Sequence, residues 1–260
     1  MLAVSTREHW IDTPLGRLFS QRWSPELAGE GAPIVLFHDS LGCVALWRDF
    51  PEQLARATGR EVIAYDRLGF GRSAAHPGLL GPGFVTEEAH EGFAALREQL
   101  GIGRFVAFGH SVGGGMAVGC AAAFGEACEA LVLESAQAFA EERTLDGIRA
   151  AERDFAAPGQ LERLARYHGD KAHWVLRAWV DTWLSAAFAT WNLDAELARL
   201  RCPLLSLHGE RDEFGSALHP ERFVTLAGGP AAMQLLSACG HVPHREKAED
   251  VLAAVRAFLA

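Results

Sequence analysis

Ser111 lies in a stretch whose residue types and spacing suit nucleophilic catalysis. Residues 109–113 read Gly-His-Ser-Val-Gly, a G-x-S-x-G pattern. The run 104–108 before it is short and mostly apolar, which predicts a buried strand, and the alanine-rich run 116–124 predicts a helix packed closely against a sheet. A serine on the tight turn from strand to helix forms a nucleophile elbow, which exposes its hydroxyl. The same turn leaves the amide of Val112 at the helix N-terminus, where it can face a developing negative charge.

His241 is the residue that we expect to activate this serine. A serine hydroxyl is a weak nucleophile until a base, normally a histidine, accepts its proton. His241 follows Gly240 on a turn between a strand predicted at 233–236 and the last predicted helix, at 246–259. His244, three residues further along the chain, is the rival candidate.

Asp212 is the acid that we expect to orient the histidine. It closes a Gly-Glu-Arg-Asp sequence directly after a predicted strand, and it falls between the serine and the histidine in chain order, as in elbow enzymes. Glu210 and Glu213 are neighbouring alternatives, and Glu134, after the preceding predicted strand, is another.

Two main-chain amides are needed to hold the negative oxygen of a tetrahedral intermediate. Val112 supplies one of them. The amide of Ser40 is the expected second donor, because the polar loop 38–42 directly follows an apolar strand predicted at 34–37.

Alternating strands and helices must position these residues. The pattern predicts a hairpin at 9–23, further strands at 34–37, 61–65, 104–108, 130–133, 204–207 and 233–236, and helices at 47–57 and 86–100. Thr86 is the expected N-cap of the second of these helices and Gly101 its expected end. Such alternation predicts an α/β fold with a mostly parallel sheet and helices on both faces.

The alternation stops after Ser135. Residues 139–200 show helical patterns and no convincing strand. We therefore predict a core made of residues 1–135 and 201–260, with residues 136–200 inserted as a helical cap over the C-terminal edge of the sheet, where open α/β sheets bind ligands.

Three tryptophans of the predicted cap give it a strongly apolar side: Trp174, Trp179 and Trp183. Each could simply anchor the cap on the core. A cap over a catalytic serine must nevertheless present some surface inward, so we expect these residues to line a dry substrate pocket that prefers apolar esters to charged ones. The cap also carries Arg149, Arg153, Arg163 and Arg166, which we interpret as a solvated face; docking of an acidic partner such as an acyl carrier protein is the alternative.

The loop 66–73 contains Gly69 and Gly71 in a G-x-G pattern. The third glycine of a dinucleotide-binding loop and the G-K-[ST] ending of a phosphate loop are missing, so we do not predict a phosphate site. Asp66 and Arg72 are expected instead to tie neighbouring loops together.

The composition excludes several classes of protein. A net charge of -9 without a Lys/Arg run argues against nucleic-acid binding. The 5 cysteines are scattered and lack a C-x-x-C pair, which indicates free thiols in a reducing cytoplasm and no zinc or other metal site. No apolar stretch reaches the length of a bilayer span, and residues 1–10 lack the apolar core of a signal peptide, so a soluble cytoplasmic protein is expected.

Five motifs together resemble those of the α/β-hydrolase superfamily, over almost the whole chain. They lie at residues 38–42, 66–73, 109–113, 209–212 and 240–241. The resemblance implies a triad of Ser111, Asp212 and His241, an oxyanion hole from the Ser40 and Val112 amides, and no cofactor. One departure is His38-Asp39, where the family usually has His-Gly. An aspartate there can alter the backbone of the loop or place a charge near the site, and some non-catalytic members carry the same pair.

A serine nucleophile argues against the members that cleave carbon–halogen bonds or epoxides, which use aspartate. The sequence therefore predicts a serine hydrolase that cleaves a small or medium carboxylic ester through an acyl-enzyme. Two alternatives remain: a carbon–carbon bond hydrolase of a diketone-like substrate with the same triad, and a small-molecule receptor of the same fold with little turnover.

Overall fold

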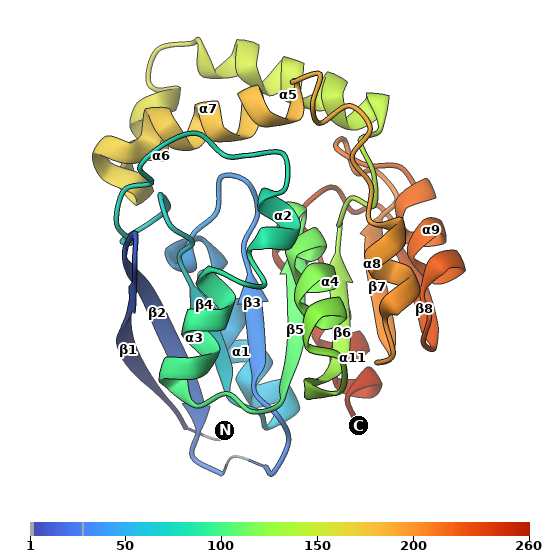
Figure 1. Ribbon diagram of the computed structural model, residues 1–260. Coiled ribbons are helices and arrows are strands. Elements are labelled where there is room, and N and C mark those ends of the chain that lie inside the picture. Colours follow the sequence, from blue (N-terminus) through green and yellow to red (C-terminus); the bar gives the residue numbers. More distant parts are fainter. Residues whose placement is uncertain (1–2, 28) are drawn as a thin grey trace.

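A central sheet of 8 strands organises the protein, in the order β1-β2-β4-β3-β5-β6-β7-β8 (Figure 1). The structure is a computed structural model that describes residues 3–27 and 29–260. Met1 and Leu2, the first residues of the segment in which no signal peptide is expected, lie outside the described residues. The strands are β1 (Val4–Thr13), β2 (Gly16–Pro25), β3 (Ile34–Phe37), β4 (Val62–Tyr65), β5 (Phe105–His110), β6 (Cys128–Glu134), β7 (Leu204–Gly209) and β8 (Ala231–Leu236).

The connecting segments are mostly helical. They contain the α-helices α1 (Phe50–Thr58), α2 (Phe84–Glu87), α3 (Gly92–Leu100), α4 (Val112–Phe124), α5 (Glu142–Phe155), α6 (Gln160–His168), α7 (Ala172–Trp183), α8 (Asp194–Arg199), α9 (Leu218–Leu226), α10 (Pro243–Glu246) and α11 (Ala248–Phe258). Short 3₁₀ helices are η1 (Val44–Trp47), η2 (Gly125–Ala127) and η3 (Gly169–Lys171).

The sheet is parallel from β4 to β8, and the antiparallel hairpin β1–β2 extends it along the outer side of β4. Strands β3 to β7 are buried on both faces, whereas the edge strands β1 and β8 are largely exposed. In β3, Val35 and Phe37 pack into one apolar core, whereas Ile34 and Leu36 pack into another, because side chains alternate along a strand. Helices α3 and α4 contribute to the first core, α1 and α11 to the second. The predicted α/β fold with helices on both faces is confirmed.

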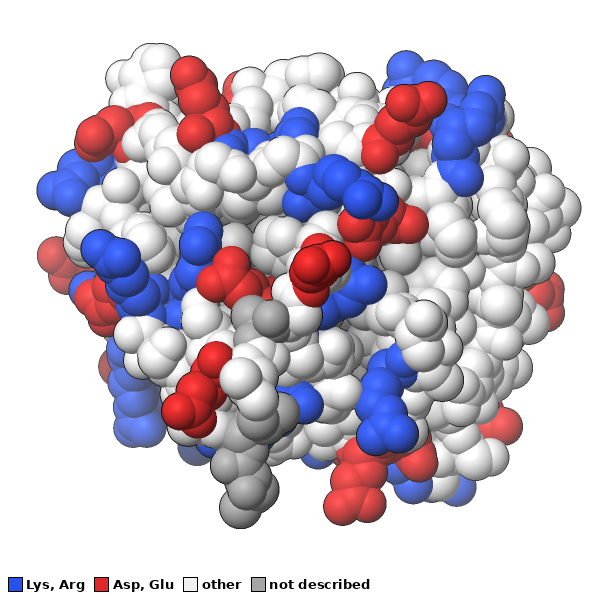
Figure 2. All heavy atoms as spheres, turned by 90° about the horizontal axis from the view of Figure 1, so that it is seen from below, with Lys and Arg blue, Asp and Glu red and all other residues white. Residues whose placement is uncertain are grey.

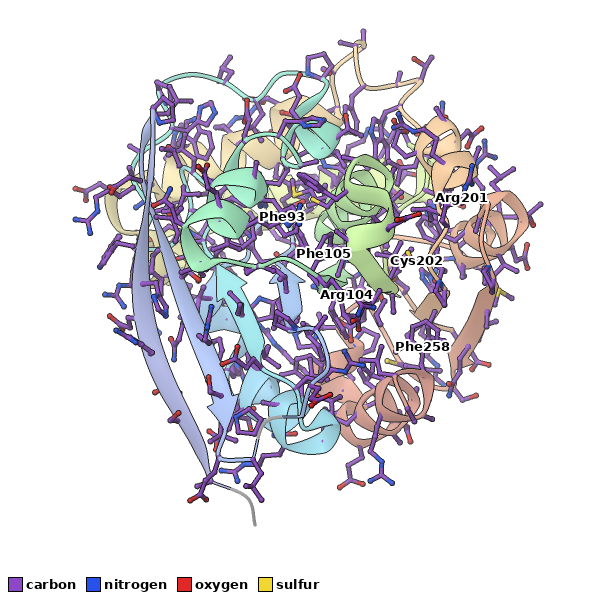
Figure 3. All side chains as sticks on the ribbon, turned by 60° about the horizontal axis from the view of Figure 1, so that its bottom comes forward. Phe93, Arg104, Phe105, Arg201, Cys202 and Phe258 are labelled. Carbon is purple, nitrogen blue, oxygen red and sulfur yellow. The ribbon has the colours of Figure 1, made fainter. Side chains whose placement is uncertain are left out.

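The parallel strands begin at the lower end of the sheet in Figure 1. Arg104 and Phe105 mark the start of β5, and Arg201 and Cys202 precede β7, at the end that Figure 3 turns toward the reader. Phe93 of α3 packs there against Phe105, with ring centroids 4.9 Å apart. Acidic and basic side chains are mixed on this face (Figure 2). The C-terminal ends of the strands therefore lie at the opposite edge.

Helices α5, α6 and α7 lie across that opposite edge (Figure 1). They follow β6 and precede β7 in the chain, as expected for an insertion. α8, which also belongs to the predicted insertion, instead lies beside α4, and its Leu197 is buried in the core on that face. The division into a core and a cap of residues 136–200 stays a prediction.

The prediction of one helix over residues 86–100 is wrong in its first part. Thr86 lies inside the short helix α2, and a new helix, α3, begins at Gly92 and ends before Gly101. The helix is interrupted between them because the buried carboxylate of Glu88 accepts a hydrogen bond from the hydroxyl of Tyr65 (2.6 Å). The same carboxylate occupies the space where a Cβ of Gly92 would lie. Gly101 adopts the left-handed conformation typical of a helix end.

The loop after β4 is held as expected. The two carboxylate oxygens of Asp66 accept hydrogen bonds from the amides of Val44 (2.6 Å) and Arg72 (2.7 Å). The guanidinium of Arg72 pairs with Glu8 of β1 at 2.6 Å. This loop is therefore a structural turn that ties three segments together.

Within the described part of the chain, no helix combines the length and the apolar character that a membrane crossing requires.

Candidate active site

A strained turn places Ser111 between β5 and α4. Its backbone has φ 55° and ψ −129°, a region that non-glycine residues rarely occupy. The flanking glycines allow this turn because a Cβ on Gly113 would lie 2.2 Å from the main-chain oxygen of Phe37, and one on Gly109 would lie 2.3 Å from that of Gly113. The elbow therefore packs directly against the end of β3, where the loop carrying Ser40 begins.

Three side chains from distant parts of the chain form one hydrogen-bonded line. Nε2 of His241 lies 3.1 Å from Oγ of Ser111, and Nδ1 of His241 lies 2.8 and 2.9 Å from the two carboxylate oxygens of Asp212. Asp212 is fully buried, and the His241 side chain is only 12% exposed. This geometry lets a base accept the serine proton while a carboxylate holds the imidazole in one orientation.

The rival candidates have other partners. Nδ1 of His244 lies 2.6 Å from Oε2 of Glu134, and both side chains are buried. Glu210 accepts a hydrogen bond from the hydroxyl of Ser237, and Glu213 is exposed. The fold thus gives two histidines that are three residues apart in the sequence different carboxylate partners.

Asp212 is kept ionised in spite of its burial. Burial alone would raise the pKa of its carboxyl, but the hydrogen bond to His241 and the nearby imidazoles of His241 and His208 lower the pKa below its usual value. The amide of Phe214 donates a further hydrogen bond to Oδ1 of Asp212 (2.8 Å). The carboxylate is therefore fixed in position and charge.

The amides of Ser40 and Val112 are available at this site. Among the described residues neither amide has a hydrogen-bond partner. The loop of Ser40 is held on both sides: the amide of Leu41 donates to Oδ1 of Asp39 (2.8 Å), and the guanidinium of Arg67 donates to the main-chain oxygen of Asp39 (2.9 Å). Two free amides beside an elbow serine are what a negative oxygen would need.

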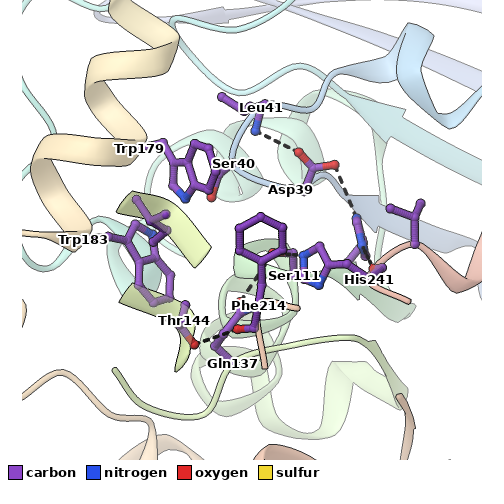
Figure 4. A pocket seen from close by; sticks show the side chains of 13 residues that line it. Asp39, Ser40, Leu41, Ser111, Gln137, Thr144, Trp179, Trp183, Phe214 and His241 are labelled. Carbon is purple, nitrogen blue, oxygen red and sulfur yellow. Dashed lines mark hydrogen bonds and ion pairs between the residues drawn. The ribbon is translucent and has the colours of Figure 1, made fainter. Parts of the chain in front are cut away.

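A pocket of about 190 Å³ opens beside Ser111 and His241 (Figure 4). Trp179 and Trp183, two of the expected pocket residues, line it together with Ser40. Apolar groups form most of the pocket surface, although polar residues also line it. The remaining lining residues are Asp39, Leu41, His110, Gln137, Thr144, Ile148, Phe214 and Val242.

Trp174, the third tryptophan expected in the pocket, is not among its lining residues. Its indole nitrogen donates to the main-chain oxygen of Gly78 (2.8 Å), and its ring stacks on His76 at 5.1 Å and packs edge-on against Phe70. Trp174 thus anchors α7 to the loops after β4, because the turn of the helix directs it away from Ser111.

Sequence reasoning did not assign Gln137, Thr144, Ile148 and Phe214 to the pocket wall. Gln137 follows β6, and its Oε1 lies 3.4 Å from Oγ of Ser111. Phe214 follows β7, and its main-chain oxygen accepts a hydrogen bond from the hydroxyl of Thr144 in α5 (2.7 Å). Ile148 lies one helical turn after Thr144 in α5. The available signal was their position, since Gln137 and Phe214 lie in the loops that follow the C-terminal ends of the parallel strands β6 and β7.

The sequence model of a known family, described as the alpha/beta hydrolase fold, matches residues 32–178, which is more than half of the chain. The chain belongs to the α/β-hydrolase family. The matched part of this α/β hydrolase includes β3, the elbow, α5, α6 and the first part of α7.

Curated relatives of this α/β hydrolase carry different hydrolase names. A proline iminopeptidase of Lactobacillus delbrueckii subsp. lactis is 31% identical over 91 residues, which is 35% of this chain and 31% of the relative. A (lyso)-N-acylphosphatidylethanolamine lipase of Bos taurus is 32% identical over 110 residues, 42% of this chain and 31% of the relative. The chain thus matches about a third of the length of these relatives.

Solved structures share the fold over the whole chain. The 2-hydroxy-6-oxo-6-phenylhexa-2,4-dienoate hydrolase from Rhodococcus sp. strain RHA1 superposes with a TM-score of 0.79, covering 99% of this chain and 100% of its own, at 18% identity. Identity this low indicates a common fold and leaves the substrate open.

Proposed function

We propose that this protein is a serine hydrolase that cleaves small neutral carboxylic esters through an acyl-enzyme. The observation that carries the proposal is the hydrogen-bonded line from Asp212 through His241 to Ser111, which ends in a pocket beside two free amides. A receptor would need neither an activated serine nor amides left free for a negative oxygen.

The proposed reaction follows from the positions of these groups. His241 accepts the proton of the Ser111 hydroxyl as its oxygen attacks the ester carbonyl, and Asp212 stabilises the imidazolium that forms. The amides of Ser40 and Val112 hold the negative oxygen of the tetrahedral intermediate. His241 returns the proton to the departing alcohol, and a water molecule then releases the acid from Ser111 by the same two steps.

The size and polarity of the pocket support a small neutral substrate. Its volume of about 190 Å³ is smaller than the roughly 300–1,000 Å³ of pockets that hold drug-sized ligands. Asp39 is the one carboxylate among the pocket-lining residues, and its oxygens already contact the Leu41 amide and His110. A free ammonium group, as at the N-terminus of a peptide, would therefore find no unshared carboxylate in this wall, which favours a neutral ester.

Two further elements of this proposal rest on other residues. The 5 cysteines are all buried and unpaired, which supports a reducing compartment such as the cytoplasm. Arg149 of α5 pairs with Glu142 and Asp146, which supports a solvated face for the cap arginines over an acyl carrier protein site.

The test is labelling with a fluorophosphonate probe together with hydrolysis of neutral p-nitrophenyl esters. Ser111→Ala should abolish labelling and lower kcat by about 10³-fold to 10⁶-fold, because no other group supplies the nucleophile. Ser237→Ala, which replaces an exposed serine, is the matched control. It should keep both the labelling and the kcat of the unmodified protein. Labelling that persists in Ser111→Ala would assign the activity to another residue, and absence of labelling in the unmodified protein would favour the receptor alternative.

A further inference from the structure

His110, the residue before the elbow serine, is buried between two hydrogen-bond acceptors. It is 2% exposed. Its Nδ1 lies 3.3 Å from Oδ2 of Asp39, and its Nε2 lies 2.8 Å from the main-chain oxygen of His241. A carboxylate and a carbonyl can only accept hydrogen bonds, so both the ion-pair contact at Nδ1 and the hydrogen bond at Nε2 are favourable only when both ring nitrogens carry a hydrogen. The geometry therefore calls for an imidazolium ring at this position.

The surrounding charges favour the same state. Two carboxylates face the ring, Asp39 from the loop after β3 and Glu134 from β6, and the imidazoles of His241 and His244 lie with ring centroids 5.1 and 5.0 Å away. Burial would lower the pKa of His110, but the hydrogen bond and charge of Asp39, the charge of Glu134 and the carbonyl of His241 raise it to about 9. His110 in turn holds the pKa of Asp39 far below its usual value, although burial opposes this shift.

We propose that Asp39 and a doubly protonated His110 form a positioning pair, which holds the Ser40 amide and the His241 backbone in place around Ser111. One oxygen of Asp39 closes the turn that contains Ser40 by accepting the Leu41 amide (Figure 4). The other oxygen faces Nδ1 of His110. The far side of the His110 ring holds the backbone of His241. The proposal rests on the function given above, because it assigns a role to residues beside that site.

The pair explains the departure from His-Gly after β3. A glycine at position 39 would have no carboxylate to balance a buried imidazolium, whereas Asp39 supplies both the charge and the acceptor for the turn. The aspartate thus changes the loop and places a charge near the site, and His110 compensates that charge.

A metal site is the competing interpretation of this cluster. Ligand atoms of His110, Glu134 and His244 lie within 4.8 Å of one another, a grouping that the spacing in the sequence did not predict. Nδ1 of His244 is, however, at hydrogen-bond distance from Glu134 (2.6 Å), and both nitrogens of His110 already face Asp39 and His241. Of the fully buried nitrogen and oxygen atoms in these three described side chains, only Oε1 of Glu134 is left without a hydrogen-bond partner. One free oxygen is too few to hold a cation while the other ligand atoms keep the contacts they have.

The charge of His110 can be measured directly by NMR on the full chain with ¹⁵N-labelled histidine. Long-range ¹H–¹⁵N spectra distinguish an imidazolium from either neutral tautomer, and the spectrum of His110→Asn assigns the signal. Near pH 7 we expect both ring nitrogens to be protonated, whereas a histidine at its ordinary pKa would be mostly neutral. In Asp39→Asn the new amide can accept from Leu41 and donate to Nδ1, so His110 should become neutral. A neutral His110 in the unmodified protein would overturn the proposal. A His110 signal that loses its imidazolium form when Zn²⁺ is added would overturn it as well.

The positioning role has a separate kinetic test. Asp39→Ala should lower kcat by about 10-fold to 100-fold with KM changed less than about 3-fold, because misplacement by a fraction of an ångström slows the reaction without closing the pocket. Asp39→Asn should recover much of this loss, and Asp250→Asn, which removes an exposed charge on α11, should match the unmodified enzyme. An unchanged kcat in Asp39→Ala, or an Asp39→Asn enzyme as slow as Asp39→Ala, would overturn the positioning role. The NMR result is independent of activity, so it still decides the charge if the protein hydrolyses none of the esters.

Discussion

His168, at the end of α6, donates a hydrogen bond from Nε2 to the main-chain oxygen of Leu41, 2.9 Å away. Its other ring nitrogen accepts the amide of Gly71, also at 2.9 Å. A single buried side chain of α6 therefore holds two loops of the sheet edge, one of which carries Ser40. Burial lowers the pKa of His168, which favours the neutral tautomer that both contacts require.

Replacing this histidine should loosen the contact between α6 and the two loops. His168→Ala leaves the amide of Gly71 and the carbonyl of Leu41 without partners, so we expect a loss of about 1–3 kcal/mol in the free energy of unfolding. Urea denaturation measures it. His173→Ala, which removes an exposed imidazole from α7, should change the free energy by less than about 0.5 kcal/mol. Equal stability of the two variants would show that His168 does not hold these loops.

The two neighbouring histidines should differ sharply in their effect on catalysis. His241→Ala should lower kcat by about 10³-fold or more, because Ser111 then has no base. His244→Asn should destabilise the fold, since Glu134 is buried against it, but should retain ester hydrolysis at low temperature. Steady-state rates on a p-nitrophenyl ester decide between them. The reverse outcome, an active His241→Ala beside a folded but inactive His244→Asn, would contradict the proposed triad.

The pocket should select short apolar acyl groups. Along a series of neutral p-nitrophenyl esters, each methylene that fits should raise kcat/KM until the pocket is full. The corresponding activation free energy should fall by up to about 1 kcal/mol per methylene. Esters with a free carboxylate should react more slowly. Trp179→Ala should move the optimum to longer chains, because Trp179 lines the pocket, whereas Trp174→Phe should leave it unchanged. A flat series, or the same shift in both variants, would contradict the apolar-pocket proposal.

Folding stability should fall as the pH rises through the titration of His110. Its pKa is raised from 6.5 to about 9 in the folded protein, so its contribution to stability is fully present below pH 6.5 and is lost as the pH approaches 9. The shift corresponds to a loss on the order of 3 kcal/mol. Urea midpoints measured across this range should decline in the unmodified protein and decline less in Asp39→Asn. A decline of equal size in both would assign the pH dependence to other groups.

Local patterns along the chain predicted much of the fold. Short apolar runs predicted the buried strands, because a strand covered on both faces must be apolar throughout. The glycines at 109 and 113 indicated the tight turn at Ser111. Gly59 and Gly101 both end helices in the left-handed conformation, as their positions after helical patterns indicate. Helix α9 and the break after α2 were not predicted, since α9 has a weak pattern and the break depends on a contact between Glu88 and Tyr65.

The sequence by itself determined which residue types stand at the C-terminal ends of the strands, and so which ones could act together. Only the tertiary structure decided their pairing. His241 and His244 differ by three positions, yet one faces Ser111 and the other Glu134, because α10 begins between them and turns the second ring into the core. The partnership of Asp39 with His110 joins the ends of two adjacent parallel strands, a contact set by the order of strands in the sheet, which no spacing along the chain encodes.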